Sequence, residues 1–262
     1  MQIKKLVRSI IGDRLYIAAH DLKVWRSTVS AAPQTIAAPP AKDPLERSGR
    51  QSETFWATRE KDNPSWVMGY WNGRTLPARA KLAETIASLG VKTVLEVGSH
   101  SGANLWAIDQ AASYVLLAGI ELSEHVLEAS KTLLAGSIKS PYAVQLGNGK
   151  GLPFENGRFD VVLSSIMLSC VGPENVKSVL SEMVRVSNRY IVLAEPFEDS
   201  RDAATPQGKP DPYPNTTYWR RNYLGLLQDM GFHVRQVSIQ HLNQQDFIGH
   251  LDSIQVLEIY QP

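Results

Sequence analysis

The sequence predicts a doubly wound α/β domain, in which helices cover both faces of a seven-stranded, mostly parallel sheet, with an N-terminal helical extension. Two observations carry this prediction. From residue 76 onward, short runs of β-branched and apolar residues alternate with segments of helical periodicity. The chain of 262 residues is 43% hydrophobic and 20% charged, values typical of a folded domain with a substantial core.

The first 50 residues differ in composition from the rest of the chain. They hold nine Lys/Arg and four Asp/Glu, so this segment is basic. Residues 3–25 carry apolar side chains at three- and four-residue spacing and are expected to form a basic amphipathic helix, and residues 31–50 read as an Ala/Pro linker. The helix is expected to pack against its own domain or a second subunit. A peripheral contact with anionic lipid is the alternative.

An aromatic segment, residues 51–76, precedes the regular pattern. It contains Trp56, Trp66, Tyr70 and Trp71. Two interpretations stay open, packing of these rings against the domain and a cap over a ligand site. The domain itself is expected to span residues 77–262.

The elements of this domain follow from periodicity and turn residues. Helices are expected at 77–89, 102–112, 123–135, 174–186 and 217–230. Strands are expected at 92–97, 114–120, 142–146, 159–164, 189–194, 232–240 and 253–260. The polar loop between the last two strands is too short for a helical crossover. The final strand is therefore expected to pair antiparallel, between the fifth and sixth strands.

Acidic residues and glycines follow the first two strands, where a doubly wound sheet binds its ligands. Glu96 ends the first strand and is followed by Gly98 and Gly102, which would let the backbone approach a ligand closely. Glu121 ends the second strand, where a carboxylate can accept hydrogen bonds from both ribose hydroxyls. A dinucleotide site requires G-x-G-x-x-G, and His100 stands at its second glycine. This substitution argues against a nicotinamide cofactor, although Glu121 alone fits either ligand.

Two further motifs occur in order, Gly147-Asn148-Gly149 with Leu152-Pro153-Phe154, and Phe159-Asp160-Val161-Val162. With the two acids and the glycine loop, they make the chain resemble the class I S-adenosylmethionine-dependent methyltransferases over roughly residues 64–260. It looks most like the branch that includes quinone-biosynthesis and glycan or natural-product enzymes. The resemblance implies strand order 3-2-1-4-5-7-6. It also implies methyl transfer from S-adenosylmethionine to a small or medium acceptor, namely a sugar, lipid-linked glycan, quinone or secondary metabolite. A hydroxyl oxygen is the expected accepting atom, with nitrogen or carbon as the alternatives.

At the methionine end of the cofactor, the resemblance assigns roles to four residues. Glu96, Gly98 and Gly102 would shape this end of the pocket. Arg79, which lies 17 residues before Glu96, would pair with the methionine carboxylate. A solvated helix arginine is the alternative for Arg79.

At the nucleoside end, the resemblance assigns five more. Glu121 would hold the ribose and Leu122 would lie against the adenine. Asn148, where the family more often has aspartate, would meet the adenine amino group, and Gly149 would give backbone access. Ser165 would line the pocket near the sulfonium.

No motif identifies a general base, because in-line methyl transfer can rely on positioning and exclusion of water. The strand ends offer His241 and Glu195 as catalytic candidates, with an exposed loop histidine and a structural acid as the respective alternatives. Cys170 is expected to be a buried small hydrophobe. The loop 196–216 contains five prolines and has the length of a lid, so the acceptor is expected between it and the aromatic segment.

Several classes of function are disfavoured. The net charge of +1 argues against a nucleic-acid partner, and the six histidines show no paired metal-ligand spacing. A single cysteine and no signal-like segment lead us to expect a cytoplasmic protein, with peripheral membrane contact as an option. A NAD(P)-dependent dehydrogenase and a non-catalytic S-adenosylmethionine-binding module remain the alternatives to a methyltransferase.

Overall fold

The computed structural model describes residues 53–58, 65–197, 219–243, 251 and 253–260, and the backbone of 205–206. The expected helix 3–25 and the Ala/Pro linker lie outside the described residues, as does nearly all of the proline-rich loop 196–216. No helix of the described part is long and apolar enough to span a bilayer.

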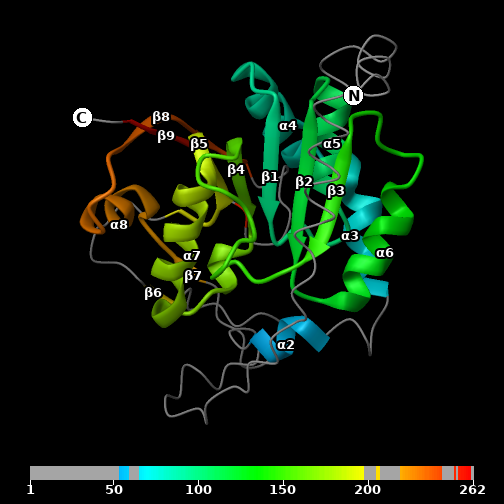
Figure 1. Ribbon diagram of the computed structural model, residues 1–262, viewed down its shortest axis with the longest axis horizontal. Coiled ribbons are helices and arrows are strands. Elements are labelled where there is room, and N and C mark those ends of the chain that lie inside the picture. Colours follow the sequence, from blue (N-terminus) through cyan, green and yellow to red (C-terminus); the bar gives the residue numbers. More distant parts are fainter. Residues whose placement is uncertain are drawn as a thin grey trace, which may run out of the picture.

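A seven-stranded sheet forms the centre of the domain (Figure 1). Its strands are β1 (Thr93–Val97), β2 (Leu116–Glu121), β3 (Tyr142–Leu146), β4 (Phe159–Ser165), β5 (Ser187–Glu195), β8 (Val234–His241) and β9 (Ser253–Ile259). The order is β3-β2-β1-β4-β5-β9-β8, and only β9 runs antiparallel to its neighbours. The predicted order and the antiparallel last strand are confirmed.

Helices cover both faces because the inner strands bury both sets of alternating side chains. The helices are α2 (Glu53–Thr58), α3 (Ser65–Asn72), α4 (Pro77–Ser88), α5 (Ala103–Ala111), α6 (Glu124–Leu134), α7 (Pro173–Val186) and α8 (Tyr223–Asp229), with short 3-10 turns at Gly73–Thr75 and Leu168–Cys170. One core cluster joins the sheet to α4, α5 and α6, and a second joins it to α7 and α8. In Figure 1, β1, β2 and β3 run downward and α2 lies below their carboxyl ends.

One predicted helix was too long. Residues 219–220 form strand β7 (Trp219–Arg220), which pairs with β6 (Thr205–Pro206), instead of opening a helix at 217. The helix begins after Asn222, whose side chain accepts a hydrogen bond from the Gly225 N–H at 2.8 Å. This N-cap supplies an early helical N–H with an acceptor and so sets the helix start.

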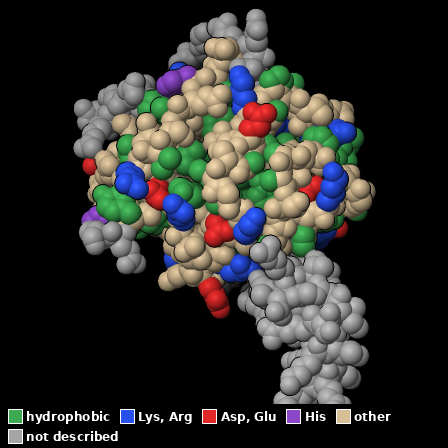
Figure 2. All heavy atoms as spheres, turned by 90° about the horizontal axis from the view of Figure 1, so that it is seen from above, with side chains coloured by type: hydrophobic (Ala, Val, Ile, Leu, Met, Phe, Trp, Pro, Cys, Tyr) green, Lys and Arg blue, Asp and Glu red, His purple; other side chains and the backbone are tan. Residues whose placement is uncertain are grey.

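The face at the amino ends of β1 to β3 is seen in Figure 2, which looks down on the molecule from above. Lys/Arg and Asp/Glu side chains are interspersed over the part of this face that the structure describes. The described residues of this face therefore form no continuous basic track of the kind that binds a phosphate backbone.

Candidate functional site

Two adjoining cavities lie at the carboxyl ends of the strands. The smaller reaches Arg79 and Glu96, and the larger extends past Glu121 to Asn148 and α7. Five residues line both cavities, namely Tyr70, Gly98, His100, Ser165 and Ile166. The two cavities together form one elongated site at the place where α/β sheets bind ligands.

The glycine loop makes the floor of this site. Gly98 has a left-handed backbone with φ of 78°, and a Cβ there would lie 2.6 Å from Cγ of Met167. Gly102 has the same φ of 78°, and a Cβ there would lie 2.7 Å from Cδ1 of Leu134. Both positions therefore require glycine. Gly98 lines both cavities, whereas Gly102 lines neither and acts through the loop conformation and its packing.

Glu121 ends β2 with its carboxylate buried beside the glycine loop. Its Oε2 accepts the His100 N–H at 2.9 Å, and its Oε1 accepts the Ser123 N–H at 2.8 Å. Burial raises the pKa of Glu121, an effect that the nearby His100 side chain and the backbone N–H groups oppose. A carboxylate offers about four lone-pair positions, so Glu121 can still accept a hydrogen bond from a ligand hydroxyl beside these backbone donors.

Glu96, near the end of β1, is linked to Arg79 by hydrogen bonds through Asn104. The sequence analysis named Glu96 and Arg79 but not Asn104. Asn104 Nδ2 donates to Glu96 Oε1 at 2.6 Å, and Arg79 Nε donates to Asn104 Oδ1 at 2.9 Å. Arg79 is buried and also donates to the Gly73 carbonyl at 2.8 Å, so it is not a solvated surface arginine.

Glu96 Oε2 is buried without a hydrogen-bond partner among the described residues, and Glu96 lines the smaller cavity. Burial raises the pKa of Glu96 to about 8. A buried acceptor of this kind suits a cationic ligand group, which would favour the ionised carboxylate.

The opposite end of the site is built by the turn after β3. Leu122, Asn148 and Gly149 line the larger cavity, as does Ser165 at the end of β4. Asn148 Oδ1 accepts the Lys150 N–H at 3.0 Å, which orders the turn. A Cβ on Gly149 would lie 3.2 Å from Val97 and Val179, so glycine lets the turn pack closely on β1 and α7.

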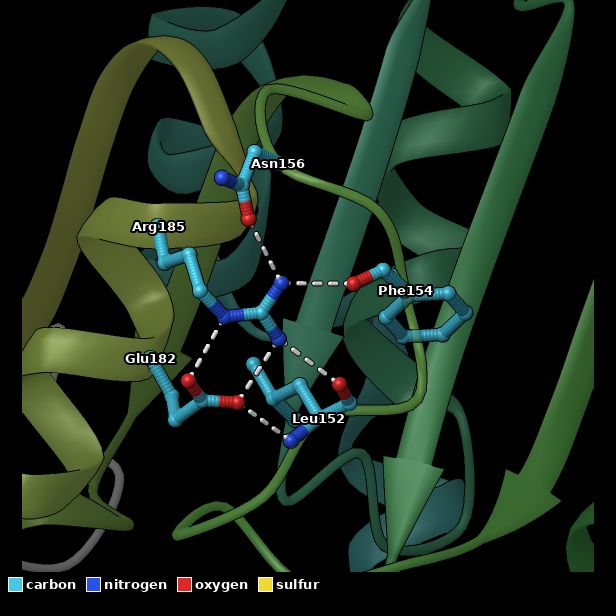
Figure 3. Close-up of polar contacts among 5 residues, drawn as sticks. All are labelled: Leu152, Phe154, Asn156, Glu182 and Arg185. Atoms are coloured by element: carbon cyan, nitrogen blue, oxygen red, sulfur yellow. Dashed lines mark hydrogen bonds and ion pairs between the residues drawn. The ribbon is translucent and has the colours of Figure 1, made fainter.

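Arg185 on α7 holds the Leu152-Pro153-Phe154 stretch, which follows that turn, in place (Figure 3). Its guanidinium donates to the Leu152 carbonyl at 2.8 Å and to the Phe154 carbonyl at 2.6 Å. Glu182 binds the same guanidinium and also accepts the Leu152 N–H at 2.7 Å. Arg185 and Glu182 together fix this segment next to the cavity wall. The sequence analysis did not find these two residues, because Glu182 lies 30 residues after Leu152.

The two catalytic candidates lie outside both cavities. Glu195 is 1% exposed and accepts hydrogen bonds from Ser164 Oγ at 2.6 Å, the Leu168 N–H at 3.0 Å and the Ser169 N–H at 3.0 Å. Burial raises its pKa. His241 is exposed at the end of β8, with its ring centroid 5.9 Å from that of Phe197. The structure brings neither side chain to the cleft, and a catalytic role for either stays a prediction.

Further residues line the larger cavity, some of them from the aromatic segment that the sequence analysis offered as a candidate cap. Cys170 is half-buried and lines the larger cavity, so the expectation of a core residue was wrong. Trp56 and Tyr70 line the larger cavity, whereas Trp71 is buried against Trp106. The aromatic segment thus both packs and covers the site. The Glu53 carboxylate forms an ion pair with Lys150, which ties α2 to the cavity rim.

The chain resembles proteins of known family and structure. Residues 94–189 match the family described as "Methyltransferase domain". An uncharacterized protein of Haemophilus influenzae is 33% identical over 97 residues, which cover 36% of this chain and 38% of that protein. The match therefore spans little more than a third of that relative.

Solved structures share the fold at low sequence identity. A chain from the complex between the Haloferax volcanii Trm112 methyltransferase activator and a methyltransferase has a TM-score of 0.54 and 16% identity, covering 80% of this chain and 96% of that one. Phosphoethanolamine N-methyltransferase 1 of Haemonchus contortus, bound to phosphoethanolamine and S-adenosylhomocysteine, has a TM-score of 0.56 and 15% identity, covering 80% and 48%.

A SAM-dependent methyltransferase from Aquifex aeolicus has a TM-score of 0.52 and 16% identity, covering 76% of this chain and 99% of that one. The strand order, the glycine loop and the two strand-end acids agree with these likenesses. Residues 94–189 therefore match a methyltransferase domain, and the chain has the class I fold that solved S-adenosylmethionine-dependent methyltransferases share.

Proposed function

We propose that this protein transfers a methyl group from S-adenosylmethionine to a hydroxyl of a small or medium acceptor, such as a sugar, lipid-linked glycan, quinone or secondary metabolite. The observation that carries the proposal is the pair of buried acids, Glu96 and Glu121, which end neighbouring strands on the two sides of the glycine loop. Because Glu96 lines the smaller cavity and Glu121 the larger, they suit a ligand with a cationic end and a ribose.

The residues present fit S-adenosylmethionine. Glu96, with its unfilled buried oxygen, would hold the methionine ammonium, and Arg79 would face the methionine carboxylate. Glu121 would accept from the ribose hydroxyls, while Leu122 and Asn148 would meet the adenine. When bound, this cofactor supplies a methyl group already activated by a positively charged sulfur. The work left to the protein is to bind, orient and exclude water.

A nicotinamide dehydrogenase is disfavoured by two observations. The His100 side chain occupies the position where a second glycine would let a pyrophosphate approach the backbone. The final strand β9 is antiparallel, which differs from the all-parallel sheet of the dehydrogenase alternative.

The larger cavity supports an acceptor with an apolar or ring-shaped body. Trp56 and Tyr70 line it from the aromatic segment, and Ile166, Met167 and Val171 line it from the loop after β4. Aromatic faces and aliphatic side chains bind such molecules by burying apolar surface. The candidates His241 and Glu195 remain proposals for a base, and the chemistry does not require one.

We propose that the chain divides into a basic extension (1–50), the aromatic segment (51–76) and the domain (77–262). Within the extension, residues 3–25 would make a subunit contact or a peripheral lipid contact. Co-sedimentation with anionic vesicles separates these two options. Lipid binding would appear at low salt and weaken at high salt, because exposed charges are screened. Absence of binding at low salt would leave the protein contact.

Calorimetry with S-adenosylhomocysteine and NADH tests the proposed function, supported by mass spectrometry of ligands that copurify with the protein. We expect S-adenosylhomocysteine to bind and NADH to give no saturable heat. Binding of NADH alone would favour the dehydrogenase. Binding of S-adenosylhomocysteine without methyl transfer to any member of a panel of hydroxylated acceptors would favour the non-catalytic module.

A further inference from the structure

Two non-glycine residues that line both cavities have a strained, left-handed backbone. Among the described residues, only His100 (φ 47°) and Ile166 (φ 58°) are non-glycine residues with positive φ. This region is costly for L-residues, and most of all for a β-branched side chain such as Ile. Both residues line both cavities. The strain is therefore concentrated where the two halves of the site meet.

The conformation of His100 is held by its neighbours. Its N–H donates to Glu121 Oε2 at 2.9 Å, which couples the backbone of the glycine loop to the ribose-side acid. Its ring lies against Tyr70 on α3, with centroids 4.4 Å apart and planes inclined by 41°. Tyr70 lines both cavities as well, so the two rings form one wall of the junction.

The conformation of Ile166 is held from the opposite side of the cleft. Its N–H donates to the Ala194 carbonyl at 2.9 Å, and its carbonyl accepts the Ser169 hydroxyl at 2.9 Å and the Cys170 thiol at 3.1 Å. Arg221 and Glu195 anchor the rest of this loop. A strained conformation persists where its surroundings determine it this fully, and such sites cluster where ligands are clamped.

We propose that Tyr70, His100 and Ile166 are positioning residues that hold the sulfonium and its methyl group at the junction of the two cavities. The inference rests on the proposed function, because a cofactor with its ammonium near Glu96 and its ribose near Glu121 carries its sulfur between them. An aromatic ring such as that of Tyr70 attracts a cation more than a neutral sulfur, and the His100 ring packs against it. Ile166 closes the other side with an aliphatic side chain.

The proposal predicts discrimination between two ligands that differ by one methyl group and one positive charge. S-adenosylmethionine carries the sulfonium, and S-adenosylhomocysteine carries a neutral thioether. We expect Tyr70→Leu to weaken S-adenosylmethionine about 5-fold more than S-adenosylhomocysteine, whereas Tyr70→Phe, which keeps the ring, retains the discrimination. Calorimetric titration of each variant with both ligands measures this ratio.

Strain gives a second, independent readout. Glycine accepts positive φ without steric strain, and this relief offsets part of the stability that His100→Gly and Ile166→Gly lose with their side-chain packing, so the thermal unfolding midpoint should change little. Both variants should nevertheless bind S-adenosylmethionine roughly 10-fold less tightly, because the walls of the junction are lost. A side chain with a merely structural role would lower the midpoint without changing the ratio of the two affinities.

The chain offers a matched control. Tyr260 and His233 form another tyrosine–histidine ring contact, with centroids 5.9 Å apart, and line neither cavity. Tyr260→Leu and His233→Gly should leave both affinities unchanged. The proposal would be overturned if Tyr70→Leu lost the same affinity for both ligands, or if both glycine variants bound S-adenosylmethionine as tightly as the unmodified protein. If the unmodified protein binds neither ligand, the proposed function itself fails.

Discussion

Glu96 and Glu195 are chemically alike and end two parallel strands of one sheet, yet they do different things. Both are 1% exposed, and burial raises the pKa of both. Glu195 accepts three hydrogen bonds from the segment 164–169 and lines neither cavity. Glu96 accepts one from Asn104, keeps a buried oxygen without a partner in the described part of the chain, and lines the smaller cavity.

The difference teaches that an acid at a strand end does not by itself indicate chemistry. A buried carboxylate whose acceptors are filled by its own chain is part of the scaffold. One that keeps an unfilled acceptor beside a cavity has a cost that a ligand can remove. Glu195 therefore stabilises the segment 164–169 through its hydrogen bonds. Glu96 is positioned to bind a ligand in the smaller cavity.

Removing the scaffold acid should have the largest effect. Glu195→Ala leaves the Ser164 hydroxyl and two backbone N–H groups buried without their acceptor, so we expect about 2–5 kcal/mol of lost stability. Urea denaturation followed by fluorescence measures it. Glu195→Gln, which keeps one carbonyl acceptor, should lose less. Equal stability of Glu195→Ala and the unmodified protein would show that the network adds nothing.

Removing the ribose-side acid should affect binding and spare the fold. We expect Glu121→Ala to weaken S-adenosylhomocysteine by roughly 1.5–3 kcal/mol, about 10- to 150-fold, because hydrogen bonds to a charged acceptor are lost. The exposed Glu128, paired with Lys131 on α6, offers Glu128→Ala as a control. An unchanged dissociation constant for Glu121→Ala would rule out the ribose role.

Neutralising the open acid should make the ligand-free protein more stable. Because the pKa of Glu96 rises from 4.5 to about 8 on folding, the folded state binds more protons than the unfolded state between these values. Glu96 therefore costs stability as pH rises through that window. Glu96→Gln should be more stable at pH 7, by on the order of 1–3 kcal/mol, and its stability should vary less between pH 5 and 8. Parallel pH profiles for both proteins would contradict this.

A half-buried acid paired with two exposed arginines gives the smallest effect and sets the baseline. Glu258 on β9 binds Arg235 at 2.6 Å and Arg189 at 3.1 Å, and the hydrogen bond from Arg235 lowers its pKa most. Surface ion pairs of this kind are screened by water and salt. Glu258→Gln should leave ligand affinity unchanged and shift the melting temperature little. A large loss of affinity would mean that charge far from the cleft governs binding.

The fold was predictable because its signals are local. Alternation of strand and helix patterns predicts a parallel sheet, and the short loop before Ser253 predicts an antiparallel return. The start of α8 was misplaced because two long-range contacts override helical periodicity there. Arg221 reaches back 53 residues to the Leu168 carbonyl, and Trp219 is buried in a strand.

The site was predictable only where a motif carried it. The nine proposed cofactor positions derive from the order of motifs, and eight of them line the two cavities, with Gly102 acting through packing. Ile166 and the Glu195 network have no local signal, because a left-handed backbone at isoleucine results from tertiary contacts alone. His100 was visible as a departure from a glycine pattern, but its contact with Tyr70 was not.

Proton release on ligand binding tests the central claim most directly. At pH 7, Glu96 is mostly protonated before binding, since its pKa is about 8, and the ammonium of S-adenosylhomocysteine should ionise it. Titration calorimetry in two buffers of different ionisation enthalpy should show binding with release of up to about one proton, and no release in Glu96→Gln. Absence of binding, or the same proton count in both proteins, would contradict the assignment of the open acid to the cofactor site.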